Sequence, residues 1–136
     1  MQGYASTRLA AIIVALACVD RLALAEDGDA TRGERIFQYC FSCHSVNPDE
    51  QAHLEGPSLY HILNRPAAAL KGFRYSEAMK KRAAEGLTWD AATLNTYVAD
   101  PQAIVPGTRM SAAPLRDEQA RSDLIAYLAK SGPHQP

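Results

Sequence analysis

The hydrophobic positions of this chain recur at helical spacing in four separate stretches, and no stretch alternates convincingly with the period of two that indicates a β-strand. Polar residues that cap helices precede these stretches, and glycine, proline or basic residues follow them. The predicted helices run from Asp29 or Thr31 to about Tyr39, from Ser76 to Gly86, from Thr88 to Pro101 and from Asp117 to Lys130. The segment 102–115 contains two prolines and a glycine and is predicted to be non-helical. The fold class is therefore all-α, with four to five short helices joined by long loops.

Two of the predicted loops exceed ten residues. Structureless segments of that length usually have a function or surround another component. Three or four short helices in a chain of this size also bury only a small core. We therefore expect a non-protein group to occupy the middle of the fold.

An unbroken apolar run covers residues 9–19, near the start of the chain. It is too short to span a bilayer, which takes about 20 apolar residues. Its length suits the hydrophobic region of a secretory signal, and residues 23–25 (Ala-Leu-Ala) supply a small-residue cleavage site. We predict that residues 1–25 are a signal peptide and that residues 26–136 form one domain in the periplasm. Cys18 lies inside the run, and the alternative is that it accepts a lipid anchor.

The charge of the predicted mature domain excludes some classes of function. Residues 26–136 hold 12 basic and 14 acidic side chains, a net charge of −2. This balance gives no indication of nucleic-acid binding. No second apolar stretch is long enough for stable membrane insertion. We expect a monomer.

The sequence Cys40-Phe41-Ser42-Cys43-His44 is the pattern of covalent haem c attachment. Two thiols at this spacing can form thioethers with the two vinyl groups of the porphyrin, and the adjacent histidine can bind the iron. A thioredoxin-like dithiol would need a βαβ context, which is not predicted. A zinc site would need two further ligands at regular spacing. A simple disulfide would leave His44 unexplained.

A six-coordinate haem iron needs a second axial ligand besides His44. The candidates in the mature domain are two methionines and three histidines: Met79, Met110, His53, His61 and His134. Met79 falls inside a predicted helix, where a methionine usually packs in the core. Met110 ends a Pro-Gly-Thr-Arg-Met segment, whose residues restrict the backbone and permit close approach.

Several motifs follow one another along the mature domain in an order that is typical of one known family. Besides the attachment pattern these are Gly56-Pro57-Ser58-Leu59, Gly72-Phe73-Arg74-Tyr75, Leu87-Thr88-Trp89, the segment ending in Met110, and Leu124-Ile125-Ala126-Tyr127-Leu128. Together they resemble the class I cytochromes c, in particular the mitochondrial carrier and the soluble periplasmic shuttles of bacteria. The resemblance implies a small cytochrome c fold wrapped around one covalent haem.

The resemblance also implies roles for individual residues. It makes Met110 the second axial ligand, and it makes the carbonyl of Pro57 the acceptor of a hydrogen bond from His44. The positions of three further side chains match residues that contact or neutralise the haem propionates: Arg65, Tyr75 and Trp89. Tyr97 matches a tyrosine that packs near the methionine sulfur. The first and last helices are expected to cross where Gly33 and Phe37 meet Leu124 and Tyr127.

Some positions depart from the pattern of these cytochromes. His61, Asn64 and Ala68 stand where glycines are usual. Met79 replaces a polar asparagine near the propionates, and Ala112 replaces a phenylalanine that covers the haem edge. These residues leave the proposed ligands intact but affect loop geometry and haem exposure.

The function implied by the resemblance is one-electron transfer by a periplasmic monohaem carrier and not enzymatic catalysis. The expected partners are redox proteins such as a bc₁-type complex, a photosynthetic reaction centre, an oxidase or a dehydrogenase. The alternative is a haem subunit or partner domain of a periplasmic oxidoreductase or of a peroxidase-like enzyme.

Overall fold

A computed structural model of the protein describes residues 28–48 and 54–132. The predicted signal peptide with Cys18 lies outside the described residues. So do two of the candidate axial ligands, His53 and His134. In the part of the chain that the model describes, no helix is both long and apolar enough to span a membrane.

Five helices are present in the described residues, which confirms the predicted all-α class. Their bounds are α1 Ala30–Phe37, α2 Glu77–Ala84, α3 Ala91–Ala99, α4 Pro101–Ile104 and α5 Glu118–Lys130. Long loops join them, and no strand forms in the described ranges apart from one isolated β-bridge.

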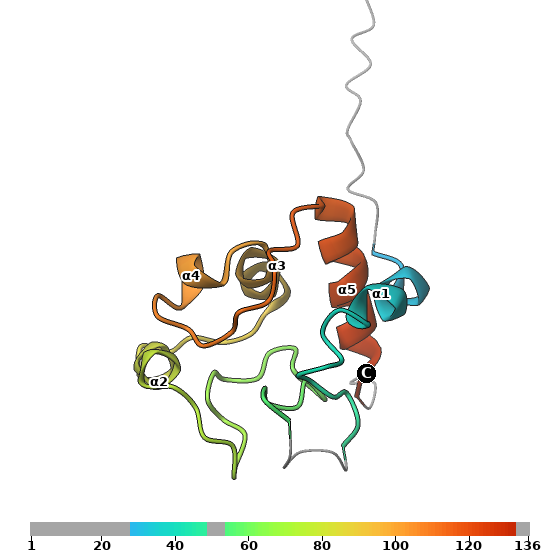
Figure 1. The fold of residues 1–136 in the computed structure, drawn as a ribbon. Coiled ribbons are helices and arrows are strands. Elements are labelled where there is room, and N and C mark those ends of the chain that lie inside the picture. Colours follow the sequence, from blue (N-terminus) through green and yellow to red (C-terminus); the bar gives the residue numbers. More distant parts are fainter. Residues whose placement is uncertain (1–27, 49–53, 133–136) are drawn as a thin grey trace, which may run out of the picture.

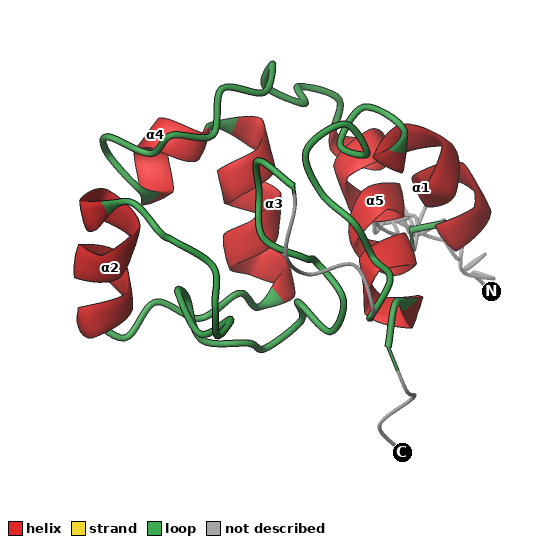
Figure 2. Cartoon of the chain, turned by 60° about the horizontal axis from the view of Figure 1, so that its bottom comes forward, coloured by secondary structure: helices red, strands yellow, loops and turns green. Residues whose placement is uncertain are grey.

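The two terminal helices pack across each other on one side of the molecule, and α2, α3 and α4 lie on the other side (Figures 1 and 2). Gly33 makes the close approach possible, because a Cβ atom there would lie 2.0 Å from the carbonyl oxygen of Asp123. The rings of Phe37 and Tyr127 meet at the same crossing in a tilted arrangement, with their centroids 5.4 Å apart. The predicted crossing is thus present in the structure.

Every helix begins at a residue whose side chain accepts a hydrogen bond from a backbone N–H of the first turn. The N-caps are Asp29, Ser76, Asp90, Asp100 and Asp117. Such caps satisfy donors that have no partner within the helix, so they fix where each short helix starts.

Two details of the sequence prediction were wrong. Thr88 does not cap the third helix, because it forms the β-bridge with Pro66 and the cap is Asp90. Residues 102–104 are helical and belong to α4. Pro101 ends α3 but occupies the first turn of α4, where its missing N–H and fixed φ are favourable.

The bridge connects the loop that precedes α2 to the segment that leads into α3. The amide of Asn64 donates to the carbonyl of Trp89, and the amide of Trp89 donates to the carbonyl of Arg65, at 2.9 and 3.0 Å. Ala67 adds a third bond of this kind, to Leu87, at 2.8 Å. These bonds hold a loop without regular structure in one position.

Three residues of this loop have a left-handed backbone, with φ of 55° at His61, 60° at Asn64 and 55° at Ala68. These three residues are the ones named above that stand in place of a usual glycine. The loop keeps a conformation that favours glycine, at the expense of steric strain between each Cβ and the backbone.

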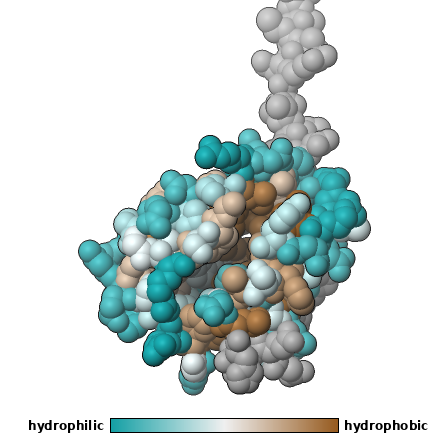
Figure 3. All heavy atoms as spheres, viewed as in Figure 1, coloured by the Kyte–Doolittle hydropathy of each residue, from teal (hydrophilic) through white to brown (hydrophobic). Residues whose placement is uncertain are grey.

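The buried apolar residues come from α1, α3, α5 and the loops between them: Phe37, Ile62, Ala67, Trp89, Leu94, Tyr97, Val105, Leu124 and Leu128. Figure 3 shows a hollow near the middle of one face, with apolar residues around its rim. The core therefore does not close over the centre of the fold.

Candidate functional site

The two cysteines of the attachment motif lie in the turns that continue α1. The amide of Cys40 donates to the carbonyl of Phe37 at 2.8 Å, and the amide of His44 donates to the carbonyl of Cys40 at 2.9 Å. Both thiols are free and partly buried. Burial raises the pKa of Cys40, and the nearby Cys43 adds to this effect, so the Cys40 thiol stays protonated near neutral pH.

His44 is held in one orientation. Its Nδ1 lies 2.7 Å from the carbonyl oxygen of Pro57, and because a carbonyl only accepts, Nδ1 is the donor. Burial lowers the pKa of His44, against the opposing effect of this hydrogen bond, so the ring is neutral and Nε2 keeps its lone pair. Gly56 makes room for the ring, since a Cβ atom there would lie 2.3 Å from Cε1 of His44.

Met110 follows the turn around Gly107 and packs against the apolar core. Its amide donates to Oγ1 of Thr108 at 3.2 Å. The same Oγ1 lies 2.9 Å from the hydroxyl of Tyr97, which is 7% exposed. Thr108 thus connects α3 to the backbone of the methionine, which restricts where the Met110 side chain can reach.

Three of the predicted pocket residues lie together. Trp89 and Tyr97 are both buried, with ring centroids 4.8 Å apart. The guanidinium of Arg65 donates to the carbonyls of Ser58 and Tyr60, at 2.7 and 3.0 Å. These two bonds anchor the charged group of Arg65. The backbone carbonyl of the same residue accepts a hydrogen bond from the amide of Trp89.

Tyr75 lies near Arg65. Burial raises the pKa of the Tyr75 hydroxyl, while a backbone hydrogen bond at Leu70 and the charge of Arg65 lower it. Its ring meets that of Phe73 edge to face, with centroids 4.8 Å apart. A cation and a phenol that is neutral near pH 7 are suited to contact carboxylates.

Two of the other candidate iron ligands have different surroundings. His61 is a loop residue that lies next to the C-terminal end of α5. Its amide donates to the carbonyl of Ser131 at 2.9 Å, and its ring packs against Gly132. Met79 lies in α2 and packs against the core. Both have a structural role in their present positions.

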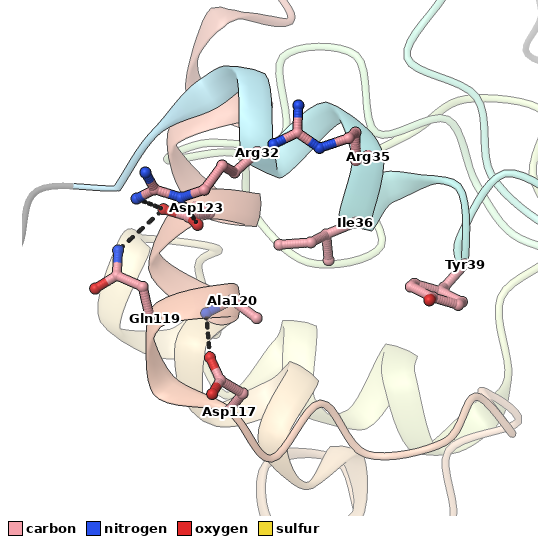
Figure 4. A pocket seen from close by; sticks show the side chains of 8 residues that line it. All are labelled: Arg32, Arg35, Ile36, Tyr39, Asp117, Gln119, Ala120 and Asp123. Atoms are coloured by element: carbon pink, nitrogen blue, oxygen red, sulfur yellow. Dashed lines mark hydrogen bonds and ion pairs between the residues drawn. The ribbon is translucent and has the colours of Figure 1, made fainter.

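A separate groove of about 380 Å³ lies between α1 and the start of α5 (Figure 4). It is lined by Arg32, Arg35, Ile36, Tyr39, Asp117, Gln119, Ala120 and Asp123. None of the predicted site residues is among them. The groove is also crossed by an ion pair between Arg32 and Asp123, at 2.6 Å, so it is not suited to a large apolar ring system.

The residues around the centre fit a covalent haem. Two free thiols stand next to a neutral histidine with an available Nε2, and the apolar core packs against both Cys40 and Met110. Gly56 leaves space beside the histidine ring. Cys40, Cys43, His44 and Met110 are therefore the residues that could hold the group and its iron.

Two contributions were missed in the sequence analysis. Thr108 was part of a quoted motif, but its contact with Tyr97 depends on packing between segments 11 residues apart. Gly56 was also part of a quoted motif, and only the structure shows that it faces His44. The available signal was the position of Gly56 directly before Pro57, whose carbonyl accepts the hydrogen bond from His44.

Comparisons with known proteins agree with this geometry. A family model described as Cytochrome c matches residues 30–132. Cytochrome c2 of Rhodomicrobium vannielii is 43% identical over 102 residues, which cover 75% of this chain and 78% of that protein. Cytochrome c2 of Blastochloris viridis is 41% identical over 100 residues, which cover 74% of this chain and 76% of that protein.

Solved structures show the same fold. The structure of cytochrome c2 from Rhodospirillum centenum is similar with a TM-score of 0.72 and 33% identity, over 78% of this chain and 100% of that chain. For cytochrome cH from Methylobacterium extorquens the TM-score is 0.67 and the identity 39%, over 74% and 97% of the two chains.

A helical fold that leaves its centre open, with an attachment motif in the turns that follow its first helix, defines a class I c-type cytochrome. This chain belongs to the cytochrome c family. As a member it carries one covalently attached haem c, and it is an electron carrier and not an enzyme.

Proposed function

We propose that this chain is a periplasmic one-electron carrier whose haem iron is bound by His44 and Met110. Cys40 and Cys43 form the two thioethers. The observation that carries the proposal is the fixed, neutral His44, whose Nδ1 bond to Pro57 at 2.7 Å leaves Nε2 as the only free ring nitrogen. The haem, when bound, supplies an iron that takes up and releases a single electron, and a methionine ligand raises its reduction potential.

The protein's own residues keep both ligands in place. Pro57 fixes the orientation of His44, as acceptors around metal ligands commonly do. Thr108 and Tyr97 restrict the backbone at Met110. Trp89 and Tyr97 are each 7% exposed and exclude water from this side of the centre. A site that holds two protein ligands leaves no position for a substrate.

The surrounding polar residues have a second role in the proposal. Arg65 and Tyr75 lie close together and present a cation and a hydroxyl group, so we assign them to the haem propionates, with Trp89 beside them. Tyr97 contacts Thr108 and belongs to the methionine side.

We further propose that residues 1–25 are a signal peptide and that the domain 26–136 exchanges electrons in the periplasm. The partners belong to the class of bc₁-type complexes, reaction centres, oxidases and dehydrogenases. Encounters between redox proteins typically bury less than about 1,200 Å², so a small surface suffices. Mass spectrometry of the exported protein tests the processing. A mature N-terminus at Glu26 is expected, and a lipid-modified Cys18 would overturn it.

Ligand variants test the iron coordination. The matched pair is Met110→Ala and Met79→Ala, because both methionines pack against the core. We expect the ferric wild type and Met79→Ala to show the weak far-red band of iron–methionine bonding. Met110→Ala should lose it and bind carbon monoxide in the ferrous state. The reverse result would assign Met79, and tight carbon monoxide or peroxide binding by the wild type would favour the enzyme alternative.

A further inference from the structure

A side chain of α2 bonds to the helix that leads into the Met110 segment. Nε of Arg82, in the last turn of α2, donates to the carbonyl oxygen of Ile104 at 2.8 Å. Ile104 is the last residue of α4 and lies six residues before Met110 in the chain. Both helices lie on the side of the molecule away from the crossing of α1 and α5 (Figures 1 and 2). Residues 105–110, which follow this contact, are called the ligand segment below.

The guanidinium of Arg82 caps the end of α4. The last carbonyls of a helix have no partner within it, and basic side chains commonly donate to them. Here the donor comes from a different helix, and an ion pair with Glu85, the C-cap residue of α2, helps to orient it. A hydrogen bond from a charged donor is about twice as strong as one between neutral groups. The contact therefore holds the C-terminal end of α4 against α2.

Arg82 differs from the other two cations of α2. Lys80 pairs with Glu77 of its own helix at 2.6 Å. Lys81 is exposed, and in the part of the chain that the model describes it does not bond to another helix. No residue of α2 is fully buried, so apolar packing attaches this helix less firmly than a buried one. Arg82 thus supplies a directional contact where apolar packing is limited.

Short hydrogen bonds connect α4 to the ligand segment. The amide of Val105 donates to the carbonyl of Pro101 at 3.0 Å, and the amide of Thr108 donates to the carbonyl of Val105 at 2.9 Å. The side chain of Gln102, in α4, accepts from the amide of Gly107 at 2.9 Å. Val105 itself is fully buried. A shift of α4 would therefore also shift the backbone just before the methionine.

The ligand segment meets the α2 side of the molecule again further along. A Cβ atom on Gly107 would lie 3.6 Å from Cβ of Ala78, so α2 lies directly against this turn. The side chain of Arg109 donates to the carbonyl of Arg74, in the loop before α2, at 2.6 Å. The α4 contact is thus the first of three places at which α2 and its preceding loop hold this part of the chain.

We propose that Arg82 is a positioning residue for the proposed iron ligand. By capping α4 from α2, it keeps the ligand segment against the centre of the fold and so keeps Met110 on the iron. It acts through α4 and not on the methionine itself. Loss of the cap frees the end of α4, and the bonds within the ligand segment carry the displacement to Met110. This inference rests on the proposed function.

The rate at which imidazole binds to the ferric holoprotein tests this role. Imidazole takes the sixth position only after the methionine has left, so at high imidazole the rate saturates at the rate of methionine release. Arg82→Met removes the donors but keeps an unbranched apolar stem. We expect the saturating rate to rise about tenfold, the factor that corresponds to one lost hydrogen bond from a charged donor. Stopped-flow absorption measures it.

Two further variants are the matched controls. Lys81→Met removes the same charge from the neighbouring exposed position and should keep the wild-type rate. Arg82→Lys keeps the charge and a donor but loses the planar fork, so its rate should lie between those of the wild type and Arg82→Met. Equal acceleration in Lys81→Met and Arg82→Met would show that the charge of α2 matters and not the bond to Ile104, which would overturn the proposal.

Removal of the methionine separates its positioning from access to the pocket. In Met110→Ala, imidazole binds without waiting for a methionine to leave. The additional substitution Arg82→Met should therefore leave the rate unchanged in this background. A further rise would mean that Arg82 controls entry of the ligand, and it would refute an action through Met110.

Hydrogen exchange in the ferrous holoprotein gives a readout independent of ligand binding. The amides of Val105, Gly107 and Thr108 should exchange about tenfold faster in Arg82→Met, whereas those of α5 should not change. Equal acceleration in α5 would indicate a general loss of stability and would overturn the proposal.

The far-red band of the wild type separates this proposal from the one on which it rests. Its absence would refute Met110 as a ligand and with it the proposed function. Its presence, together with wild-type imidazole and exchange rates in Arg82→Met, would refute only the role of Arg82.

Discussion

A Cβ atom on Gly56 would lie 2.3 Å from Cε1 of His44 and 2.7 Å from both of its ring nitrogens. The imidazole cannot simply turn away, because Pro57 holds its Nδ1. A glycine therefore fixes the space in which the proposed iron ligand stands.

Gly56→Ala should disturb this ligand. We expect a loss of stability of about 2 kcal/mol, as overpacking usually causes. The displaced histidine should also weaken its bond to iron and increase carbon monoxide binding, which visible spectroscopy measures. Pro57→Ala serves as the control, since it keeps the carbonyl that accepts from His44. Wild-type spectra and stability in Gly56→Ala would show that the histidine is not confined in this way.

The crossing of α1 and α5 should tolerate no side chain at Gly33. A methyl group would lie 2.0 Å from the carbonyl oxygen of Asp123 and 2.7 Å from Cβ of Tyr127, and the first of these is backbone that cannot rotate away. Gly33→Ala should therefore separate the helices and lower the free energy of unfolding by about 3 kcal/mol. Thr31→Ala, at an exposed position of the same helix, should change it little. Guanidinium denaturation of the holoprotein measures both.

Asp123 links the stability of the same crossing to pH. Hydrogen bonds from Arg32, from the amide of Asp29 and from Gln119 hold the pKa of this buried carboxyl well below its usual range. A lowered pKa means that the carboxylate stabilises the fold above the unfolded-state pKa of about 4, and that this contribution is lost as the pH falls below it.

Asp123→Asn should therefore lower the melting temperature at pH 7 and flatten its decline in acid. Thermal unfolding followed between neutral pH and about pH 2 measures both effects. Glu118→Gln removes an exposed carboxylate from the same helix and is the control. If the acid decline of Asp123→Asn matches that of the wild type, the Arg32 contact does not carry the pH dependence.

The sequence predicted most of the fold because the relevant signals are local. Ser76 and Asp117 begin their helices where capping chemistry indicates, and Gly86 follows α2 with a φ of 88°. The predicted start of α3 was wrong because of a contact between residues that are distant in the chain. Thr88 is a good capping residue, but it is engaged with Pro66 across the β-bridge.

For the candidate site too, local signals could be predicted and contacts between distant residues could not. Cys40, Cys43 and His44 are adjacent in the chain, so their spacing alone indicates their chemistry. The role of Thr108 could not be predicted, because its hydroxyl meets Tyr97 only after α3 has packed. Ala68 gives no local indication of a left-handed backbone, and tertiary contacts impose it.

This imposed conformation leads to a stability prediction. A left-handed backbone is unfavourable for alanine by about 1 kcal/mol or more. Ala68→Gly removes this strain but adds freedom to the unfolded chain, which offsets about 0.4–1 kcal/mol. A net gain of about 0.5 kcal/mol is expected. Asn64→Gly should be close to neutral, because asparagine tolerates this region better. Equal effects of the two substitutions in chemical denaturation would argue against strain at Ala68.

The hydrogen-bonded pair of Tyr97 and Thr108 should be coupled energetically and should protect the Met110 ligand. Removal of either hydroxyl, in Tyr97→Phe or Thr108→Val, leaves the other without its 2.9 Å partner in a partly buried setting. Each change should lower the free energy of unfolding by about 1–2 kcal/mol.

The double variant should lose less than the sum of the two single losses, with a coupling energy of about 1 kcal/mol. Thr108→Val also removes the acceptor of the Met110 amide, so its far-red band should vanish at a lower pH than in the wild type. Thr108→Ser keeps the hydroxyl and should restore both properties. Strictly additive losses, with an unchanged band in Thr108→Val, would show that Met110 is positioned by packing alone and that this hydroxyl only satisfies Tyr97.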